Sequence, residues 1–230
     1  MNKPTQKTDS LIYFAVIGDL VASRSIPARE KFQKQFAQVL SSINESFKPS
    51  IASQFTVTVG DEFQGLLSEA SQICRMMDSV ITRLYPVKVR FGIGIGTMST
   101  EIDPTKSLGA DGPAFWAARK AIEYIHENSD YGSSRACLFS AGLSQSRLIN
   151  ASLAANGLIL DGWRGTQMAV LKALVDSDLY GPDFEQVKLA EYMGLTPASL
   201  QKRIKGSGVK VYIRNGAAIS EAINELGKLE

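Results

Sequence analysis

A nearly continuous apolar run at residues 11–17, LIYFAVI, is the feature that most restricts how this chain can fold. An apolar strand of this kind is typical of the centre of a sheet, where both faces are covered. The run ends at Gly18-Asp19, so a carboxylate follows a strand that is otherwise predicted to be buried. The function of that carboxylate is the main question that the sequence raises.

The next 140 or so residues alternate between strand and helix patterns. Residues 55–59 (FTVTV) alternate strictly, Gly60-Asp61 makes a turn, and residues 63–67 resume an apolar pattern, which predicts a β-hairpin. The other patterns predict helices over 28–47, 68–84, 113–126 and 140–155 and strands over 87–96 and 136–139. This order indicates an α+β sandwich with one antiparallel or mixed sheet covered by helices.

Beyond Asn156-Gly157 the strand patterns end and short amphipathic helices are predicted over 165–175, 184–193 and 197–205. The turn at 194–197 is followed by a helix that Thr196 can cap, which is a helix-turn-helix pattern. We therefore predict two domains, 1–157 and 158–230. The alternating residues 209–214 (VKVYIR) are expected to form part of a wing.

The overall composition excludes little. The chain has 230 residues with a formal net charge of +2, which alone supports neither a nucleic-acid nor a membrane partner. No apolar run approaches the roughly 20 residues of a membrane span, and the polar start lacks a signal peptide. We expect a cytoplasmic protein with no membrane partner, in which Cys74 and Cys137 are buried small hydrophobic residues.

Three acidic residues are candidate metal ligands. Asp19 ends the first strand, and Asp61 and Glu62 lie at the tip of the hairpin. If these strands are neighbours, the carboxylates converge and offer the oxygen ligands that Mg²⁺ or Mn²⁺ prefers. The alternative is ordinary turn chemistry, since Asp is common at strand ends and in hairpins.

A turn directly after Asp19 is a candidate phosphate site. Its backbone N–H groups, from Leu20, Val21, Ala22 and Ser23, lead towards a helix, and Arg24 or Arg29 would add positive charge. Together with a metal ion, this turn would suit a nucleoside triphosphate.

Four separated motifs resemble those of class III nucleotidyl cyclases: GDLVAS at 18–23, TVGDEF at 58–63, VRFGIGIG at 89–96 and GPAFWAAR at 112–119. The GDEF sequence is also similar to the signature of diguanylate cyclases, which share a ferredoxin-like palm. The whole chain looks like a member of the SatD family. The resemblance implies that Asp19 and Asp61 bind the metal, that Glu62 lies beside it, and that Arg119 is catalytic by steadying phosphate charge.

Two positions depart from the cyclase pattern. Phe115 stands where cyclases usually place a transition-state asparagine, and Val57 where adenylyl cyclases place a base-reading lysine. Phenylalanine cannot donate the missing hydrogen bond, so cyclisation is disfavoured while metal-nucleotide binding is not. His126, the only histidine, is explained by a helix C-terminus and is given no catalytic role.

The tail contains a basic segment from Thr196 to Arg214, with no acidic residue. In a helix-turn-helix the second helix enters the major groove and its first residues face bases. Here the residues near bases would be Pro197, Ser199, Leu200 and Gln201, and those on phosphates would include Lys202, Arg203 and Lys205. The alternatives are a dimerisation or packing module and a solvated basic face. A homodimer suits both readings.

Three functions remain open from the sequence. The favoured one is a regulator that binds Mg²⁺ and a nucleoside triphosphate or signalling nucleotide and carries a DNA-binding tail. The second is a cyclase-type enzyme that makes a nucleotide signal, and the third is a non-catalytic scaffold for protein contacts.

Overall fold

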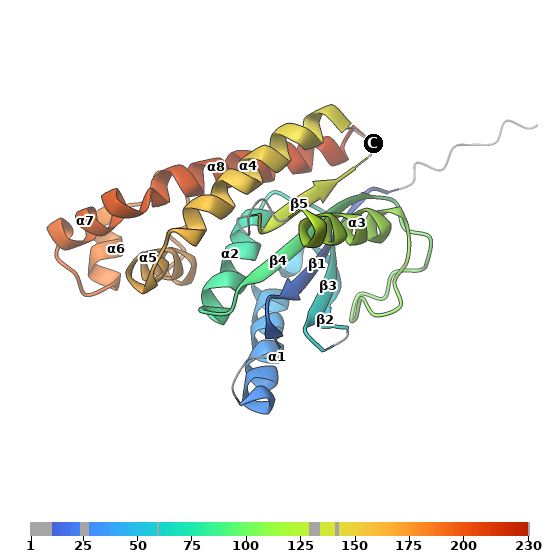
Figure 1. Cartoon of the computed structure of the whole chain (residues 1–230), viewed down its shortest axis with the longest axis horizontal. Helices are drawn as coiled ribbons and strands as arrows, with labels where there is room; N and C mark the ends of the chain where they lie inside the picture. The colour runs from blue at the N-terminus through green and yellow to red at the C-terminus, as the bar shows by residue number, and fades with distance from the viewer. Residues whose placement is uncertain (1–10, 24–27, 59, 129–133, 141–142, 230) are drawn as a thin grey trace, which may run out of the picture.

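The computed structural model describes residues 11–23, 28–58, 60–128, 134–140 and 143–229. They form a five-stranded mixed sheet and helices, in agreement with the α+β prediction. Figure 1 shows the sheet at one end and the C-terminal helices extending from it. The finer assignment to a ferredoxin-like, cyclase-type palm stays a prediction.

Strand β1 (Tyr13–Leu20) occupies the centre of the sheet, as its apolar sequence predicts. The strand order is β2-β3-β1-β4-β5, in which β2 (Ile51–Val57) and β3 (Glu62–Leu67) form the predicted hairpin. β1 pairs antiparallel with both β3 and β4 (Val89–Gly96), and the edge strand β5 (Ala136–Phe139) runs parallel to β4. The first strand and the hairpin are therefore neighbours, which the metal hypothesis required.

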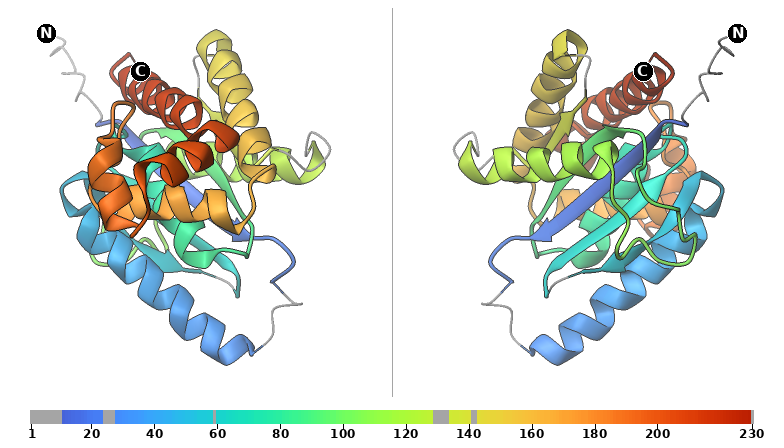
Figure 2. Two further views of the ribbon diagram at one scale, coloured as in Figure 1. Left: turned by 90° about the vertical axis from the view of Figure 1, so that its left-hand side faces the viewer. Right: turned by 90° about the vertical axis from the view of Figure 1, so that its right-hand side faces the viewer.

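The two faces of the sheet are covered by different helices (Figure 2). The helices α1 (Arg29–Ser46) and α2 (Ile73–Leu84) share one hydrophobic cluster with Phe63 and Phe91. On the opposite face, α3 (Pro113–Glu127) packs Phe115 and Ala118 against the sheet. The alternation of β1 divides its side chains between the two layers, and Asp19 has the same parity as Ala15 and Ile17, which face α3.

Glycines of β4 let α3 approach the sheet closely. A Cβ atom at Gly94 would lie 2.1 Å from the carbonyl oxygen of Ala114, and one at Gly92 would lie 2.3 Å from that of Ala118. The glycine repeat of this strand thus serves helix packing.

The C-terminal helices continue the core. The helix α4 (Leu143–Asp161) passes without interruption through the predicted domain boundary at 157–158, so the helix predicted to end at residue 155 is longer than expected. The remaining helices are α5 (Gly165–Asp176), α6 (Gln186–Tyr192), α7 (Pro197–Ser207) and α8 (Val209–Gly227). One hydrophobic cluster extends from β1 and α2 into α5, α7 and α8, so the two predicted domains share their core.

The predicted wing is wrong. Residues 209–214 begin the 19-residue helix α8, which buries Tyr212, Ile213, Gly216 and Ile219 at helical spacing. The alternation of six residues was too short to distinguish a strand from the first turns of a buried helix.

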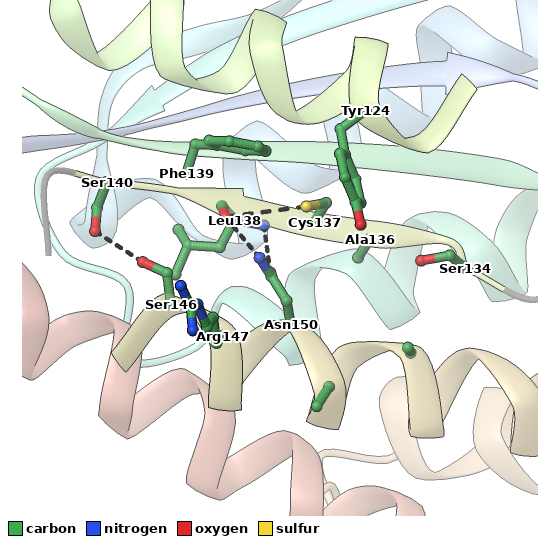
Figure 3. A pocket seen from close by; sticks show the side chains of 12 residues that line it. Tyr124, Ser134, Ala136, Cys137, Leu138, Phe139, Ser140, Ser146, Arg147 and Asn150 are labelled. Carbon is green, nitrogen blue, oxygen red and sulfur yellow. Dashed lines mark hydrogen bonds between the residues drawn. The ribbon is translucent and has the colours of Figure 1, made fainter. Parts of the chain in front are cut away.

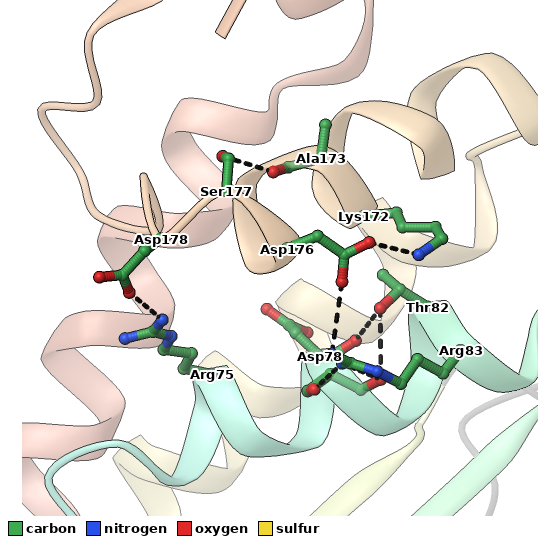
Figure 4. A network of polar contacts seen from close by, with 10 residues as sticks. Arg75, Asp78, Thr82, Arg83, Lys172, Ala173, Asp176, Ser177 and Asp178 are labelled. Atoms are coloured by element: carbon green, nitrogen blue, oxygen red, sulfur yellow. Dashed lines mark hydrogen bonds and ion pairs between the residues drawn. The ribbon is translucent and has the colours of Figure 1, made fainter. Parts of the chain in front are cut away.

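A polar junction joins α2 to the C-terminal helices. The Asp78 carboxylate, 2% exposed, accepts hydrogen bonds from the hydroxyls of Tyr180 at 2.7 Å and Tyr212 at 2.5 Å. Figure 4 shows α2 making two further ion pairs at this junction, Arg75 with Asp178 and Arg83 with Asp176.

No helix within the described ranges is both long enough and apolar enough to span a membrane.

Candidate functional site

Asp19 lies one residue before the end of β1, on the face of the sheet that α3 covers. It stands opposite Glu62 of β3 on one side and Arg90 of β4 on the other. Its side chain is 17% exposed, and Oδ2 lies 3.3 Å from His126 Nε2 and 3.7 Å from Arg90 Nη1. The buried strand thus ends in a carboxylate that is held between two basic side chains.

The hairpin brings two more carboxylates to the same end of the sheet. This end, where β1 finishes beside the start of β3, is called the β1–β3 edge below. Leu20 N donates a hydrogen bond to the Asp61 carbonyl oxygen at 3.2 Å, and the Ser23 hydroxyl donates to Asp61 Oδ2. Burial raises the pKa of Asp19 above its usual value, and the charges of Asp61 and Glu62 raise it further. His126 and Arg90 act in the opposite direction. The three acids predicted as metal ligands therefore lie close enough to interact electrostatically.

Arg119 joins this cluster from α3. Its guanidinium forms a two-pronged ion pair with Glu62, with Nη1 to Oε2 at 2.5 Å and Nη2 to Oε1 at 2.8 Å. The Thr58 hydroxyl also donates to Glu62 Oε1, at 3.1 Å. Glu62 is thus engaged by an arginine, and this contact raises the pKa of Arg119. The structure brings the predicted catalytic arginine to the predicted metal ligands within one chain.

The sequence gives His126 no role and leaves Arg90 open between a phosphate ligand and a solvated strand residue. The Arg90 Nη1 atom lies 3.0 Å from His126 Nδ1, so the two side chains contact each other as well as Asp19. In the sequence, His126 lies near a helix end, and Arg90 lies on the same face of its strand as the glycines that follow at every second position. Their meeting depends on α3 crossing β4 and β1, a long-range feature that no local pattern contains.

The turn after β1 differs in part from the predicted phosphate site. The N–H groups of Leu20 and Val21 already donate to the carbonyl oxygens of Asp61 and Lys88. These two amides are therefore not presented to a ligand, which corrects the prediction for both residues. Ala22 has a positive φ of 55°, and Ser23 is bound to Asp61. Arg24 lies outside the described residues.

The position of the cyclase asparagine faces the core. Phe115 is 6% exposed and packs with Ala15 and Ile17 between α3 and the sheet, one helical turn before Arg119. A hydrogen-bond donor at position 115 would point into apolar packing. Val57 is half-buried against the other hydrophobic cluster.

The predicted DNA-contacting residues lie on α7. Its buried side, formed by Leu200 and Ile204, faces the core, and the Thr196 hydroxyl caps its start by accepting a hydrogen bond from Ser199 N. The prediction that Leu200 faces bases is wrong, because its side chain is buried in the core. Arg203 is half-buried, and the other predicted residues are exposed: Pro197, Ser199, Gln201, Lys202 and Lys205.

Within the described ranges, no group of three or more His, Cys, Asp or Glu side chains is placed to hold a metal ion together. Any ion at this edge would therefore need ligands from its substrate or from water, as Mg²⁺ commonly has.

Comparisons with known proteins give a family and a distant fold likeness. Two solved structures of a bacterial light-regulated adenylyl cyclase are similar, with TM-scores of 0.41 and 0.40 at 14% and 15% identity. The likeness covers 60% and 61% of this chain and 46% of each cyclase chain, so this chain spans under half of those structures. The comparison with curated proteins finds no match. Residues 13–223 match the SatD family, and the chain, matched from its first strand into its last helix, belongs to that family.

Proposed function

We propose that this SatD protein is a regulator that binds a nucleoside polyphosphate with a divalent cation at the β1–β3 edge and contacts DNA through α7. The observation that carries the first half is that Asp19 interacts electrostatically with both Asp61 and Glu62, and that Arg119, from a distant segment, forms an ion pair with Glu62. In a ferredoxin-like palm of the cyclase type, residues at these positions would bind the metal ion and the phosphates of a nucleotide.

Asp19 and Asp61 are the residues that would hold the cation. Both side chains carry carboxylate oxygens, the ligands that Mg²⁺ prefers. Burial is the main cause of the raised pKa of Asp19, and the negative charges of Asp61 and Glu62 add to it. A bound cation would favour the charged form of this carboxylate. When bound, Mg²⁺ neutralises phosphate charge and lowers the pKa of a coordinated hydroxyl or water.

Arg119 and Arg90 would bind the phosphates. Arg119 is 43% exposed although Glu62 holds it, so its guanidinium is both positioned and accessible. Arg90 lies beyond Asp19 on the next strand. Two guanidinium groups on either side of a carboxylate pair suit a polyphosphate, because arginine binds phosphate oxygens in pairs.

The buried position of Phe115 favours binding over turnover. The side chain of residue 115 cannot donate to a transition state, and loss of a comparable donor typically costs a hundredfold or more in rate. A cyclase-type enzyme therefore remains the less supported alternative, and a protein-contact scaffold remains if no nucleotide binds.

The second half of the proposal concerns the tail. The exposed side of α7 carries Lys202, Lys205 and Gln201. The helices α5 and α6 both pack against α7. In this arrangement the lysines would contact phosphates and Gln201 would reach base edges. A homodimer would present two such helices to a two-fold operator.

Isothermal titration calorimetry with ATP and GTP, each with and without Mg²⁺, tests the nucleotide site. We expect binding that requires the cation and falls at least tenfold in Asp19→Asn and Asp61→Asn. Asp183→Asn, at an exposed position in the tail, is the matched control and should bind like the wild type. Absence of binding by the wild-type protein under all conditions would refute the proposal.

Fluorescence anisotropy with DNA from the promoter of the protein's own operon tests the tail. Replacing Lys202 and Lys205 by alanine should weaken binding and reduce the slope of log affinity against log salt by about two. An affinity that does not depend on salt would show that α7 does not contact phosphates.

A further inference from the structure

The edge strand β5 is the floor of a groove between α3 and α4. Figure 3 shows Tyr124 of α3 above the strand and Arg147 and Asn150 of α4 below it. The cavity has a volume of about 390 Å³, within the range of sites for small ligands. The groove lies on the flank of α3 opposite to Arg119 and His126, because Lys120 and Tyr124 are turned away from those residues at helical spacing.

The strand edge itself is already closed at Leu138. Leu138 N donates to Asn150 Oδ1 at 2.7 Å, and Asn150 Nδ2 donates to the Leu138 carbonyl oxygen at 2.9 Å. The carboxamide thus takes the place of a neighbouring strand at this residue. An added peptide strand would have to break both bonds, so a ligand of this groove must be recognised by side chains.

Aromatic rings and cations supply that recognition. Tyr124 is 42% exposed and contacts Phe139 edge to face, with the ring centroids 5.9 Å apart. Lys120 Nζ lies 4.9 Å from the centroid of the Phe139 ring. Arg147 is exposed on the other wall.

A second hollow continues past Phe139. It has a volume of about 490 Å³ and is lined by Trp116, Lys120 and Phe139 among others. Trp116 is 58% exposed although its indole N–H donates to Asp111 at 2.6 Å, so the ring is fixed in place with its surface accessible. Among the described residues that line the two hollows, none is acidic.

We propose that these two hollows form a second ligand site, which binds a planar aromatic anion of the nucleotide class without a metal ion. Stacking on exposed aromatic rings favours a planar base, and Lys120 and Arg147 favour a phosphate. The absence of carboxylates from the described lining sets this groove apart from the acidic β1–β3 edge, so the two sites differ in their need for a cation.

Quenching of tryptophan fluorescence by AMP in the presence of EDTA tests this site. Trp116 is exposed whereas Trp163 is only 9% exposed, so a ligand in the groove should change mainly the signal of Trp116. We expect saturable quenching by AMP and at least tenfold weaker effects of adenosine and of inorganic phosphate, each of which has one half of the required chemistry.

Variants separate this site from the acidic edge. Lys120→Ala and Arg147→Ala should each weaken AMP binding about five- to tenfold, whereas Lys34→Ala, an exposed lysine on α1, should not change it. Asp19→Asn should also bind AMP normally. Circular dichroism melts of the variants confirm that they are folded.

Three results would overturn the proposal: no saturable quenching, equal binding of AMP and inorganic phosphate, or unchanged affinity in both groove variants. A DNA octanucleotide that binds a hundredfold more tightly than AMP would also overturn it, because the groove would then belong to a nucleic-acid strand.

Discussion

The buried carboxylate of Asp78 predicts an unusual dependence of stability on pH. Burial raises its pKa from 3.8 to about 7, although the hydrogen bonds from Tyr212 and Tyr180 lower it. The folded protein therefore holds a proton that the unfolded chain releases between these two values. The contribution of Asp78 to the free energy of unfolding is greatest below about pH 4. It falls as the pH rises through this window and is constant above about pH 8.

The size of the effect follows from the difference between the two pKa values. A pKa difference of about three units corresponds to roughly 4 kcal/mol, which is a large fraction of the stability of a typical domain. The neighbouring groups should stay neutral across the window. Burial raises the pKa of Cys74 to about 12 and that of both tyrosines well above 10.

The test compares wild type with Asp78→Asn by urea denaturation between pH 5 and 8. Trp163, whose ring centroid lies 4.9 Å from that of Tyr212, reports on this junction. Because an amide does not titrate, the variant should become more stable relative to the wild type by roughly 3 kcal/mol between pH 5 and 8, since about two of the three pKa units lie in this range. Tyr212→Phe removes a bond that lowers the pKa, so its transition should move to higher pH.

Asp183→Asn, at an exposed position, should run parallel to the wild type at every pH. If the wild-type and Asp78→Asn curves were also parallel, Asp78 would not carry a raised pKa and the reasoning would fail.

Three further predictions concern the sheet and its edge. Asn150→Leu leaves the polar groups of Leu138 without their partner and should cost about 2 kcal/mol in urea denaturation, with association of exposed edges visible by light scattering. Gly94→Ala places a methyl group against the carbonyl oxygen of Ala114 and should lower the stability by at least about 2 kcal/mol, measured in the same way. Arg119→Lys cannot form a two-pronged ion pair and should weaken polyphosphate binding about tenfold in calorimetry while leaving the melting temperature nearly unchanged.

Local periodicity predicted the sheet layer well because each pattern reports which face of its own segment is buried. The apolar run of β1 and the strand over 136–139 lie where the sequence placed them. The hairpin is also present, but its first strand covers Ile51–Val57 rather than 55–59, and residue 59 is outside the described residues. Periodicity failed at 209–214, where six alternating residues belong to a helix whose other turns decide the period. It also placed the end of α4 too early, because Asn156-Gly157 suggested a break that packing against α8 overrides.

The candidate site was predicted in part for the same physical reason. Asp19, Asp61 and Glu62 could be found because strand ends and hairpin tips are visible in sequence, and their meeting needed only that two strands be neighbours. His126, Arg90 and Asp78 act through contacts made by crossing helices. A histidine at a helix end and an aspartate within an amphipathic helix look ordinary until their partners are known.

The shared core limits how the two halves of the proposed regulator can communicate. Because α8 packs on α2 and α4 and its last residue, Gly227, lies against the Phe14 ring of β1, the tail cannot rotate as a separate body on a flexible linker. A ligand at the β1–β3 edge would therefore alter α7 through the α2–α8 contact that contains Asp78. If so, Asp78→Asn should change the effect of nucleotide on DNA affinity even though Asp78 contacts neither ligand, and an unchanged effect would place the coupling elsewhere.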